Sequence, residues 1–316
     1  ETGKPKKEKK ADYSKVFGEK LIELAKNNEK IIAITASMKD GTGLTKFAKE
    51  FPDRFFDIGI AEQHALTMAA GMAKEGMIPF VPIYSSFYQR AYDQVIHDIA
   101  IQKLPVIMCV DRAGVVGADG ETHQGTLDMA FFRIVPNITI MAPKDFKEFE
   151  DMLEFATTLN KPVVIRYPRG GENNNIKFEK HEKIELGKAE VIKEGQDISI
   201  IAIGKRAAKA IEIAKEYEKQ GNNAEIINAR FLKPLDKETI KKSIEKTKKV
   251  ITMEDGTEIN GLGTAIEELI VEENLQGIEM KKYAWPDEFI RHGTVEELEE
   301  YVQKGRLDKM SIGDRS

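Results

Sequence analysis

The sequence predicts an α/β fold of two consecutive domains, each built on a mainly parallel sheet. Short apolar runs rich in Val and Ile alternate with longer amphipathic stretches, a pattern typical of parallel strands covered by helices on both faces. The chain has 316 residues, which is enough for about two domains of ~150 residues. An aperiodic stretch at 170–178 with three consecutive Asn residues separates the two series.

The first series opens with a helix and continues as alternating strands and helices. Phe17, Leu21 and Ala25 share one face of the opening helix, and the chain turns at Asn27-Asn28. The apolar runs that follow predict strands at 31–34, 55–58, 78–84, 106–110, 138–141 and 163–167. The stretches between them predict helices at 61–74, 87–102 and 145–159.

The second series repeats the same alternation. Its predicted strands are 198–203, 224–227, 250–253 and 278–283, and its predicted helices are 207–220, 237–246, 264–274 and 295–303. The predicted domain plan is a disordered linker at 1–10, a first domain at 11–170, a linker at 171–185 and a second domain at 186–316.

Composition narrows the class of protein. Lys and Arg number 48 and Asp and Glu number 53, a net charge of −5, and this mild acidity argues against a nucleic-acid partner. No apolar run approaches the ~20 residues of a membrane span. Cys109 is the only cysteine, which excludes an intrachain disulfide. We therefore expect a protein of a reducing compartment without a membrane partner.

Glu62 is the first candidate for chemistry, because ligands of open parallel sheets bind at the carboxyl ends of strands. It follows the predicted strand 55–58 and opens a helix that is otherwise small and apolar. One interpretation is a desolvated carboxyl that exchanges a proton with a ligand nitrogen. The other is a carboxylate that only stabilises a helix N-terminus.

Three aromatic residues and an arginine follow the predicted strand 78–84. Tyr84 and Phe87 lie at the strand-to-helix turn, where a flat heteroaromatic ring could stack. Arg90 is three residues beyond Phe87 and projects from about the same face of a helix. Core packing is the alternative for the aromatic rings.

The glycine-rich segment 111–125 suggests a polar substrate pocket. It carries Arg112, Asp119, Glu121 and His123 among four glycines, and it matches neither a P-loop nor a dinucleotide motif. A metal site and an ordinary surface loop are the alternatives.

Two arginines, Arg166 and Arg169, end the last strand of the first series just before Gly170. Guanidinium groups grip phosphate or carboxylate bidentately, and they also pair with acids across domain interfaces.

Four segments in this order resemble the thiamine-diphosphate-dependent transketolase family: DIGIAEQHA, YSSFYQRAYDQ, DRAGVVGADGETHQG and RYPRG. They are most similar to its branch that condenses pyruvate with D-glyceraldehyde 3-phosphate to 1-deoxy-D-xylulose 5-phosphate, releasing CO₂. The resemblance continues through NARFLKPLD, TMEDG and WPDEFIRHG. It implies a pyrimidine-binding domain followed by the family's C-terminal domain.

The resemblance also implies a role for each candidate that binds the cofactor. Glu62 matches the glutamate that contacts N1′ of the aminopyrimidine of thiamine diphosphate. Phe87 matches the aromatic residue that stacks on this ring, and Arg90 matches an arginine close to it.

The same resemblance implies how the substrates are bound. Tyr84, Arg112 and Arg169 match residues around the phosphate of glyceraldehyde 3-phosphate. Asp119 and His123 match polar residues beside the reacting carbons, which makes His123 a catalytic candidate together with Glu62.

One family motif is absent from the 316 residues. The family's amino-terminal domain binds the diphosphate through Mg²⁺ with a Gly-Asp-Gly motif, which this sequence lacks. We therefore expect a fragment that lacks this domain and its metal site and is inactive by itself. The resemblance also implies a homodimer in the bacterial cytoplasm, with a plastid location and the oligomeric state of the fragment left open. Two alternatives stay open: the C-terminal subunit of a split transketolase, and a non-catalytic dimerisation fragment.

Overall fold

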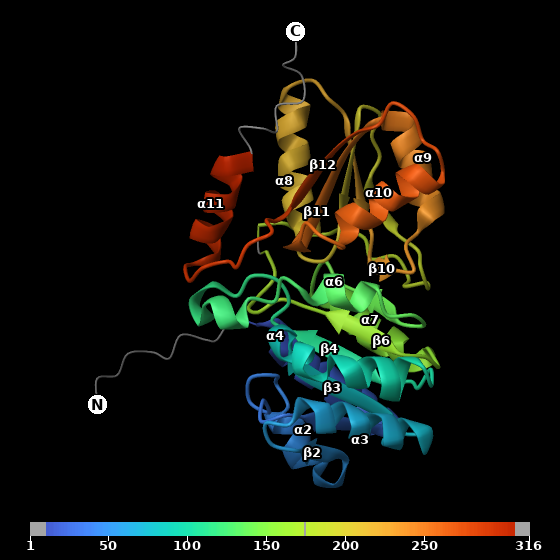
Figure 1. The fold of residues 1–316 in the computed structure, drawn as a ribbon, viewed down its shortest axis with the longest axis vertical. Coiled ribbons are helices and arrows are strands. Elements are labelled where there is room, and N and C mark those ends of the chain that lie inside the picture. Colours follow the sequence, from blue (N-terminus) through green and yellow to red (C-terminus); the bar gives the residue numbers. More distant parts are fainter. Residues whose placement is uncertain (1–10, 174, 307–316) are drawn as a thin grey trace, which may run out of the picture.

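Two sheets, one above the other along the long axis of the molecule, organise the chain (Figure 1). The computed structural model describes residues 11–173 and 175–306, and the predicted linker at 1–10 lies outside this part. Most neighbouring strands are parallel, so the predicted fold class is confirmed. Within the described ranges, no helix is long and apolar enough to cross a membrane.

The first sheet places the carboxyl ends of its central strands level with one another. Over the described residues its strand order is β10-β5-β6-β4-β3-β1-β2, and β10 alone runs antiparallel to its neighbour. The strands are β1 (Ile31–Thr35), β2 (Phe55–Asp57), β3 (Ile78–Tyr84), β4 (Ile107–Asp111), β5 (Thr139–Met141), β6 (Val163–Arg166) and β10 (Phe231–Lys233). Tyr84 pairs with Asp111, and Val110 pairs with Arg166.

Helices cover both faces of this sheet. They are α1 (Tyr13–Asn27), α2 (Thr45–Glu50), α3 (Glu62–Lys74), α4 (Ser85–Tyr88), α5 (Tyr92–Gln94), α6 (Asp128–Arg133) and α7 (Phe146–Thr158). The side chain of Asp12 caps α1 by accepting a hydrogen bond from the Lys15 amide. Phe17 of α1 and Phe149 of α7 are buried in one core cluster, and Leu66 of α3 belongs to another.

The second sheet has the strand order β12-β11-β8-β9-β7 across the described residues, with β7 antiparallel to β9. Its strands are β7 (Glu190–Lys193), β8 (Ile198–Ala202), β9 (Ala224–Asn228), β11 (Lys249–Thr257) and β12 (Glu279–Trp285). The accompanying helices are α8 (Arg206–Lys219), α9 (Lys237–Thr247), α10 (Leu262–Glu272) and α11 (Val295–Arg306). Every residue of β8 and β9 is buried, as expected for parallel strands with helices on both faces.

The sequence predicted one continuous helix over 87–102, but this stretch is a series of short helical turns of different kinds. The helical segment begins directly after β3, and the chain then passes through α4, a 3-10 turn (Gln89–Ala91), α5 and a π-helical turn (Val95–Ala100). Ala91, with φ −118° and ψ 22°, departs from helical geometry at this break. The irregular turn carries Arg90 to within 3.6 Å of Glu62.

Strand β10 is an element that the sequence did not predict. It follows β9 of the second sheet but pairs with β5 at the edge of the first, and Phe231 is fully buried in the first domain's core. Strand β7 and the short helices α2 and α6 were also not predicted. These four elements are three to six residues long, which is too short for hydrophobic periodicity to identify them. The predicted domain boundaries stay a prediction.

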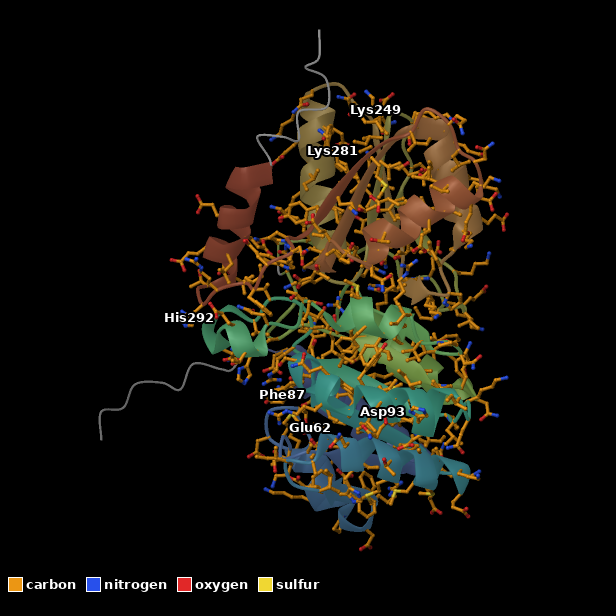
Figure 2. The ribbon with its side chains drawn as sticks, in the orientation of Figure 1. Glu62, Phe87, Asp93, Lys249, Lys281 and His292 are labelled. Carbon is orange, nitrogen blue, oxygen red and sulfur yellow. The ribbon has the colours of Figure 1, made fainter. Side chains whose placement is uncertain are left out.

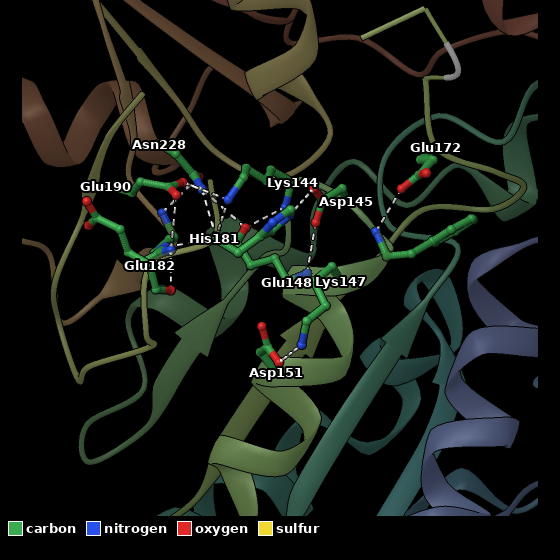
Figure 3. A network of polar contacts seen from close by, with 12 residues as sticks. Lys144, Asp145, Lys147, Glu148, Asp151, Glu172, His181, Glu182, Glu190 and Asn228 are labelled. Atoms are coloured by element: carbon green, nitrogen blue, oxygen red, sulfur yellow. Dashed lines mark hydrogen bonds and ion pairs between the residues drawn. The ribbon is translucent and has the colours of Figure 1, made fainter. Parts of the chain in front are cut away.

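A buried cluster of charges ties the second domain to α7 (Figure 3). The Glu148 carboxylate accepts hydrogen bonds from the Lys144 Nζ at 3.2 Å, Asn228 Nδ2 at 3.0 Å and Arg230 Nε at 2.8 Å. Glu190 of β7 accepts a further bond from the Lys144 Nζ at 2.7 Å. Each charge is therefore both paired and hydrogen-bonded, which is the condition for burying it.

We predict that Glu148→Ala lowers the free energy of unfolding by about 3–5 kcal/mol, because it leaves Lys144 and Arg230 buried with one carboxylate fewer. Asp151→Ala is the matched control, because it removes the carboxylate of an exposed ion pair with Lys147 on the same helix. The control is expected to change the free energy by less than about 1 kcal/mol. Urea unfolding measures both variants. Equal losses would contradict this account of the cluster.

Candidate active site

The residues singled out from the sequence lie at the carboxyl edge of the first sheet. Glu62 follows β2, Tyr84 ends β3, Arg112 follows β4, and Arg169 lies three residues beyond β6. The chain leaves β1 for β2 on one side and returns to β3 on the other, so the strand order reverses between β1 and β3. Such a reversal is where open α/β sheets bind ligands. Figure 2 shows Glu62 and Phe87 at this edge.

Glu62 is a buried carboxylate with an incomplete set of partners. It is 4% exposed and is the first residue of α3, where the helix dipole favours negative charge. In the described part of the chain its polar partner is Arg90, whose Nη1 lies 3.6 Å from Oε1. This distance gives an ion pair but exceeds a good hydrogen bond. The carboxylate therefore retains capacity for a further donor.

Aromatic rings form a row beside Glu62. The guanidinium of Arg90 lies 5.4 Å from the centre of the Phe87 ring. The Phe87 ring stacks against Tyr84 at 5.7 Å and meets the His123 ring edge-on at 5.3 Å. The structure thus brings together the residues that the sequence predicted for the cofactor ring, with His123 next to them.

Arg112 is held rigidly at the end of β4. Its guanidinium stacks on the Tyr84 ring at 3.8 Å and donates to the Gly41 carbonyl at 2.9 Å. Its Nη1 also lies 2.9 Å from Oδ1 of the buried Asp111. The backbone of Arg112 has φ +60°, a left-handed conformation that costs free energy for a residue with a side chain.

Arg169 reaches the glycine-rich segment through an ion pair with Asp119. Its Nη1 lies 2.6 Å from Oδ1 of Asp119, and both side chains are partly exposed. The charges of Asp119 and Arg169 are among those that influence the pKa of the Tyr84 hydroxyl, in opposite directions. The pair is open to competition from an anionic ligand, because exposed ion pairs contribute little free energy.

Burial governs the titration of the site. Complete burial raises the pKa of Asp111 from 3.8 to about 6, against the opposing effects of the Arg112 charge and a hydrogen bond from Ser14. Burial likewise raises the pKa of the Tyr84 hydroxyl. Tyr84 is therefore a neutral hydrogen-bond donor at pH 7.

Two residues of the site were missed by sequence reasoning. Asp111 and Gly41 both bind Arg112, and a Cβ on Gly41 would lie 1.8 Å from the Tyr84 hydroxyl. The string Asp40-Gly41-Thr42-Gly43 follows β1, so the rule about carboxyl ends could have identified it. Among the residues that the structure describes, no group of three or more His, Cys, Asp or Glu side chains is placed to hold a metal ion.

Two protein-family models match the chain. The model for the pyrimidine binding domain of transketolase matches residues 9–172, and the model for the transketolase C-terminal domain matches residues 187–305. The first match contains every residue of the site described above.

Relatives and solved structures extend this likeness. A 1-deoxy-D-xylulose-5-phosphate synthase from Halothermothrix orenii is 50% identical over 301 residues, which are 95% of this chain and 47% of that protein. The chain thus spans about half the length of the curated relatives it matches.

A solved structure described as a split gene transketolase, inactive beta4 tetramer, is 33% identical with a TM-score of 0.83, and the match covers 92% of this chain and 93% of that one. The transketolase from Campylobacter jejuni shares the fold, with a TM-score of 0.75 at 19% identity over 95% of this chain and 45% of that one.

We predict that Asp111→Asn changes how stability depends on pH. An aspartate has a pKa of about 3.9 when unfolded, so the folded chain binds this proton more tightly between about pH 4 and pH 6. The contribution of Asp111 to the free energy of unfolding therefore falls as pH rises through this window, by at most about 3 kcal/mol.

The free energy of unfolding of Asp111→Asn should not fall in this way between about pH 4 and pH 6. Denaturant unfolding at a series of pH values would measure it. Asp53→Asn, which changes an exposed carboxylate, should keep the wild-type profile. Parallel profiles for wild type and Asp111→Asn would show that the carboxyl does not titrate in this window.

Proposed function

The chain belongs to the transketolase family, and from this membership we propose that it is the part of a 1-deoxy-D-xylulose-5-phosphate synthase that holds the pyrimidine end of thiamine diphosphate and the acceptor substrate. The observation that carries the proposal is the under-bonded carboxylate of Glu62, next to Arg90 and Phe87. The arginines proposed to bind phosphate lie at the same sheet edge.

The residues fit an aminopyrimidine. Among the described residues the Glu62 carboxylate has no donor within hydrogen-bond distance, and a ring nitrogen that carries or shares a proton would supply one. Phe87 is partly exposed and offers an aromatic surface for stacking beside that carboxylate. We propose that a separate domain holds the diphosphate and Mg²⁺, since this sequence has no Gly-Asp-Gly motif.

Each side chain then has a defined task. When bound, thiamine diphosphate supplies the carbanion equivalent and electron sink for the decarboxylation of pyruvate. Glu62 holds a proton at N1′ of the pyrimidine, and Phe87 orients this ring. Arg112, Arg169 and the neutral Tyr84 hydroxyl bind the phosphate of glyceraldehyde 3-phosphate, which fixes the aldehyde for attack.

Asp119 and His123 complete the proposed acceptor site. The His123 ring touches Phe87, and its Nδ1 lies 2.9 Å from the Thr122 hydroxyl, which orients the imidazole. We assign His123 to proton exchange with the acceptor's developing hydroxyl. Asp119 shares Arg169 with the incoming phosphate, so phosphate binding loosens the Asp119 pair.

A second candidate is the C-terminal subunit of a split transketolase. The observation that favours it is the split gene transketolase chain that matches this chain over 93% of its own length. The donor substrate separates the two candidates, because a transketolase uses a ketose phosphate and the synthase uses pyruvate. Homodimer formation and a cytoplasmic location remain predictions.

We predict that Glu62→Gln lowers kcat at least ~10²-fold, the scale of general acid–base contributions. The assay uses a fusion protein in which the amino-terminal half of the Halothermothrix orenii synthase precedes residue 1 of this chain; it is called the fusion below. The variant keeps the shape of Glu62 but loses the carboxyl that shares the proton. Glu75→Gln, at the exposed far end of α3, should leave kcat unchanged. Near-normal turnover of Glu62→Gln would assign Glu62 to helix stabilisation alone.

We predict that Arg112→Ala and Arg169→Ala in the fusion each lower kcat/KM for glyceraldehyde 3-phosphate about 10- to 150-fold. Charge-assisted hydrogen bonds contribute roughly 1.5–3 kcal/mol each, and 1.4 kcal/mol is about a tenfold change. Glyceraldehyde has no phosphate to lose, so both variants should use it almost as well as wild type does.

The matched control for Arg112 is Arg54→Ala. Arg54 also stacks on a ring, that of Phe51, and donates to a backbone carbonyl, but it lies at η1 (Pro52–Arg54), away from the candidate site. It should not discriminate between the two acceptors. Equal losses on both acceptors for Arg112→Ala and Arg169→Ala would show that these arginines are structural.

A further inference from the structure

The second domain contacts the glycine-rich segment through the stretch 286–298, here called the strap. Gln124, which is 8% exposed, joins the two. Its Oε1 accepts hydrogen bonds from the amides of Val116 at 2.8 Å and Gly117 at 3.4 Å, and its Nε2 donates to the Arg291 carbonyl at 3.1 Å. One side-chain amide thus binds the backbone of both segments.

Apolar packing brings the strap onto the same place. Val115 of the glycine-rich segment is buried in a cluster with Trp285, Ile290 and Leu298. Gly117 has φ +64°, and a Cβ there would lie 2.7 Å from the Gly293 carbonyl oxygen. A side chain at position 117 would therefore push the strap away.

The strap is anchored in the second domain. The indole Nε1 of Trp285, at the end of β12, donates to the Asp255 carboxylate at 2.6 Å. Arg206 of α8 binds the same carboxylate at 3.1 Å and Glu299 of α11 at 2.6 Å. These contacts fix the strap at both ends, so its position follows that of the second sheet.

We propose that Gln124 is a positioning residue through which the second domain holds the segment that bears Asp119 and His123. The side chain of Gln124 binds the backbone at Val116-Gly117, just before Asp119. The next residue, Gly125, forms backbone hydrogen bonds with Gly114 and so closes the segment. The consequence for acceptor binding rests on the proposed function, whereas the coupling of the two segments does not.

The first test uses the 316-residue chain and two variants of Gln124. Gln124→Ala removes all three hydrogen bonds and should speed amide exchange at Val116 and Gly117 about tenfold or more, as loss of a hydrogen bond of about 1.4 kcal/mol implies. Gln124→Glu keeps the acceptor but loses the donor to the Arg291 carbonyl. These two amides should then stay protected while the strap loosens.

Trp285 reports on the strap, because it is the only tryptophan and is 2% exposed. Quenching of its fluorescence by acrylamide should increase in both variants. Gln102→Ala is the control and should change neither readout, because it removes an exposed amide whose hydrogen bond, in the part of the chain that the structure describes, is to the nearby Asp98 carbonyl. Unchanged exchange in Gln124→Ala, or unchanged quenching in both variants, would overturn the proposal.

The second test measures the effect on the acceptor in the fusion. Gln124→Ala should raise KM for glyceraldehyde 3-phosphate about tenfold with little change in the rate of pyruvate decarboxylation, and Gln124→Glu should restore part of the loss. A faster-exchanging segment with an unchanged KM would overturn the positioning role. A wild-type fusion that does not condense the two substrates would overturn the proposed function, and the exchange test would still decide the coupling.

Discussion

Parallel pairing of β1, β3, β4 and β6 is the constraint on which the rest of the structure depends. Because the backbone hydrogen bonds align these strands, the residues that follow them are delivered to one edge of the sheet. Tyr84 and Asp111 are partners in the register, and this pairing lets the Arg112 guanidinium lie on the Tyr84 ring. A slip of one residue would turn Tyr84 to the other face of the sheet and separate the two groups.

Two buried glutamates show how the same residue type serves structure and candidate chemistry. Glu148, in the first turn of α7, accepts bonds from side chains of both domains and has no capacity to spare. Glu62, at the start of α3, is nearly as buried, and its one polar contact among the described residues is the 3.6 Å approach of Arg90. The second arrangement leaves acceptor capacity that a donor on a ligand can use, whereas the first does not.

The sequence predicted the features that depend on local pattern, namely the buried strands and the polar residues that follow them. Runs such as 31–34 and 106–110 are apolar throughout because both faces of the sheet are covered, and the rule of carboxyl ends then located Glu62, Tyr84 and Arg112. The partners of these residues could not be read from the pattern. Asp111 is the last residue of a buried strand, and only the fold shows that its carboxylate meets Arg112 and Ser14.

The sequence also failed to predict elements that pack against residues far from them along the chain. Strand β10 is three residues long and takes its stability from the edge of β5 rather than from its own composition. The strap is similar, since nothing in the string around Arg291 indicates a contact with Gln124, 167 positions away. Tertiary contact, and not local propensity, determines both.

The central claim is that this chain supplies the proton-sharing carboxyl and the acceptor site of a pyruvate-using synthase. Donor choice in the fusion tests it most directly, once calorimetry has shown that the fusion binds thiamine diphosphate. The account predicts CO₂ release from pyruvate that is coupled to consumption of glyceraldehyde 3-phosphate, with no turnover of ketose phosphates. A fusion that binds the cofactor but transfers two-carbon units from a ketose phosphate, and leaves pyruvate untouched, would contradict it.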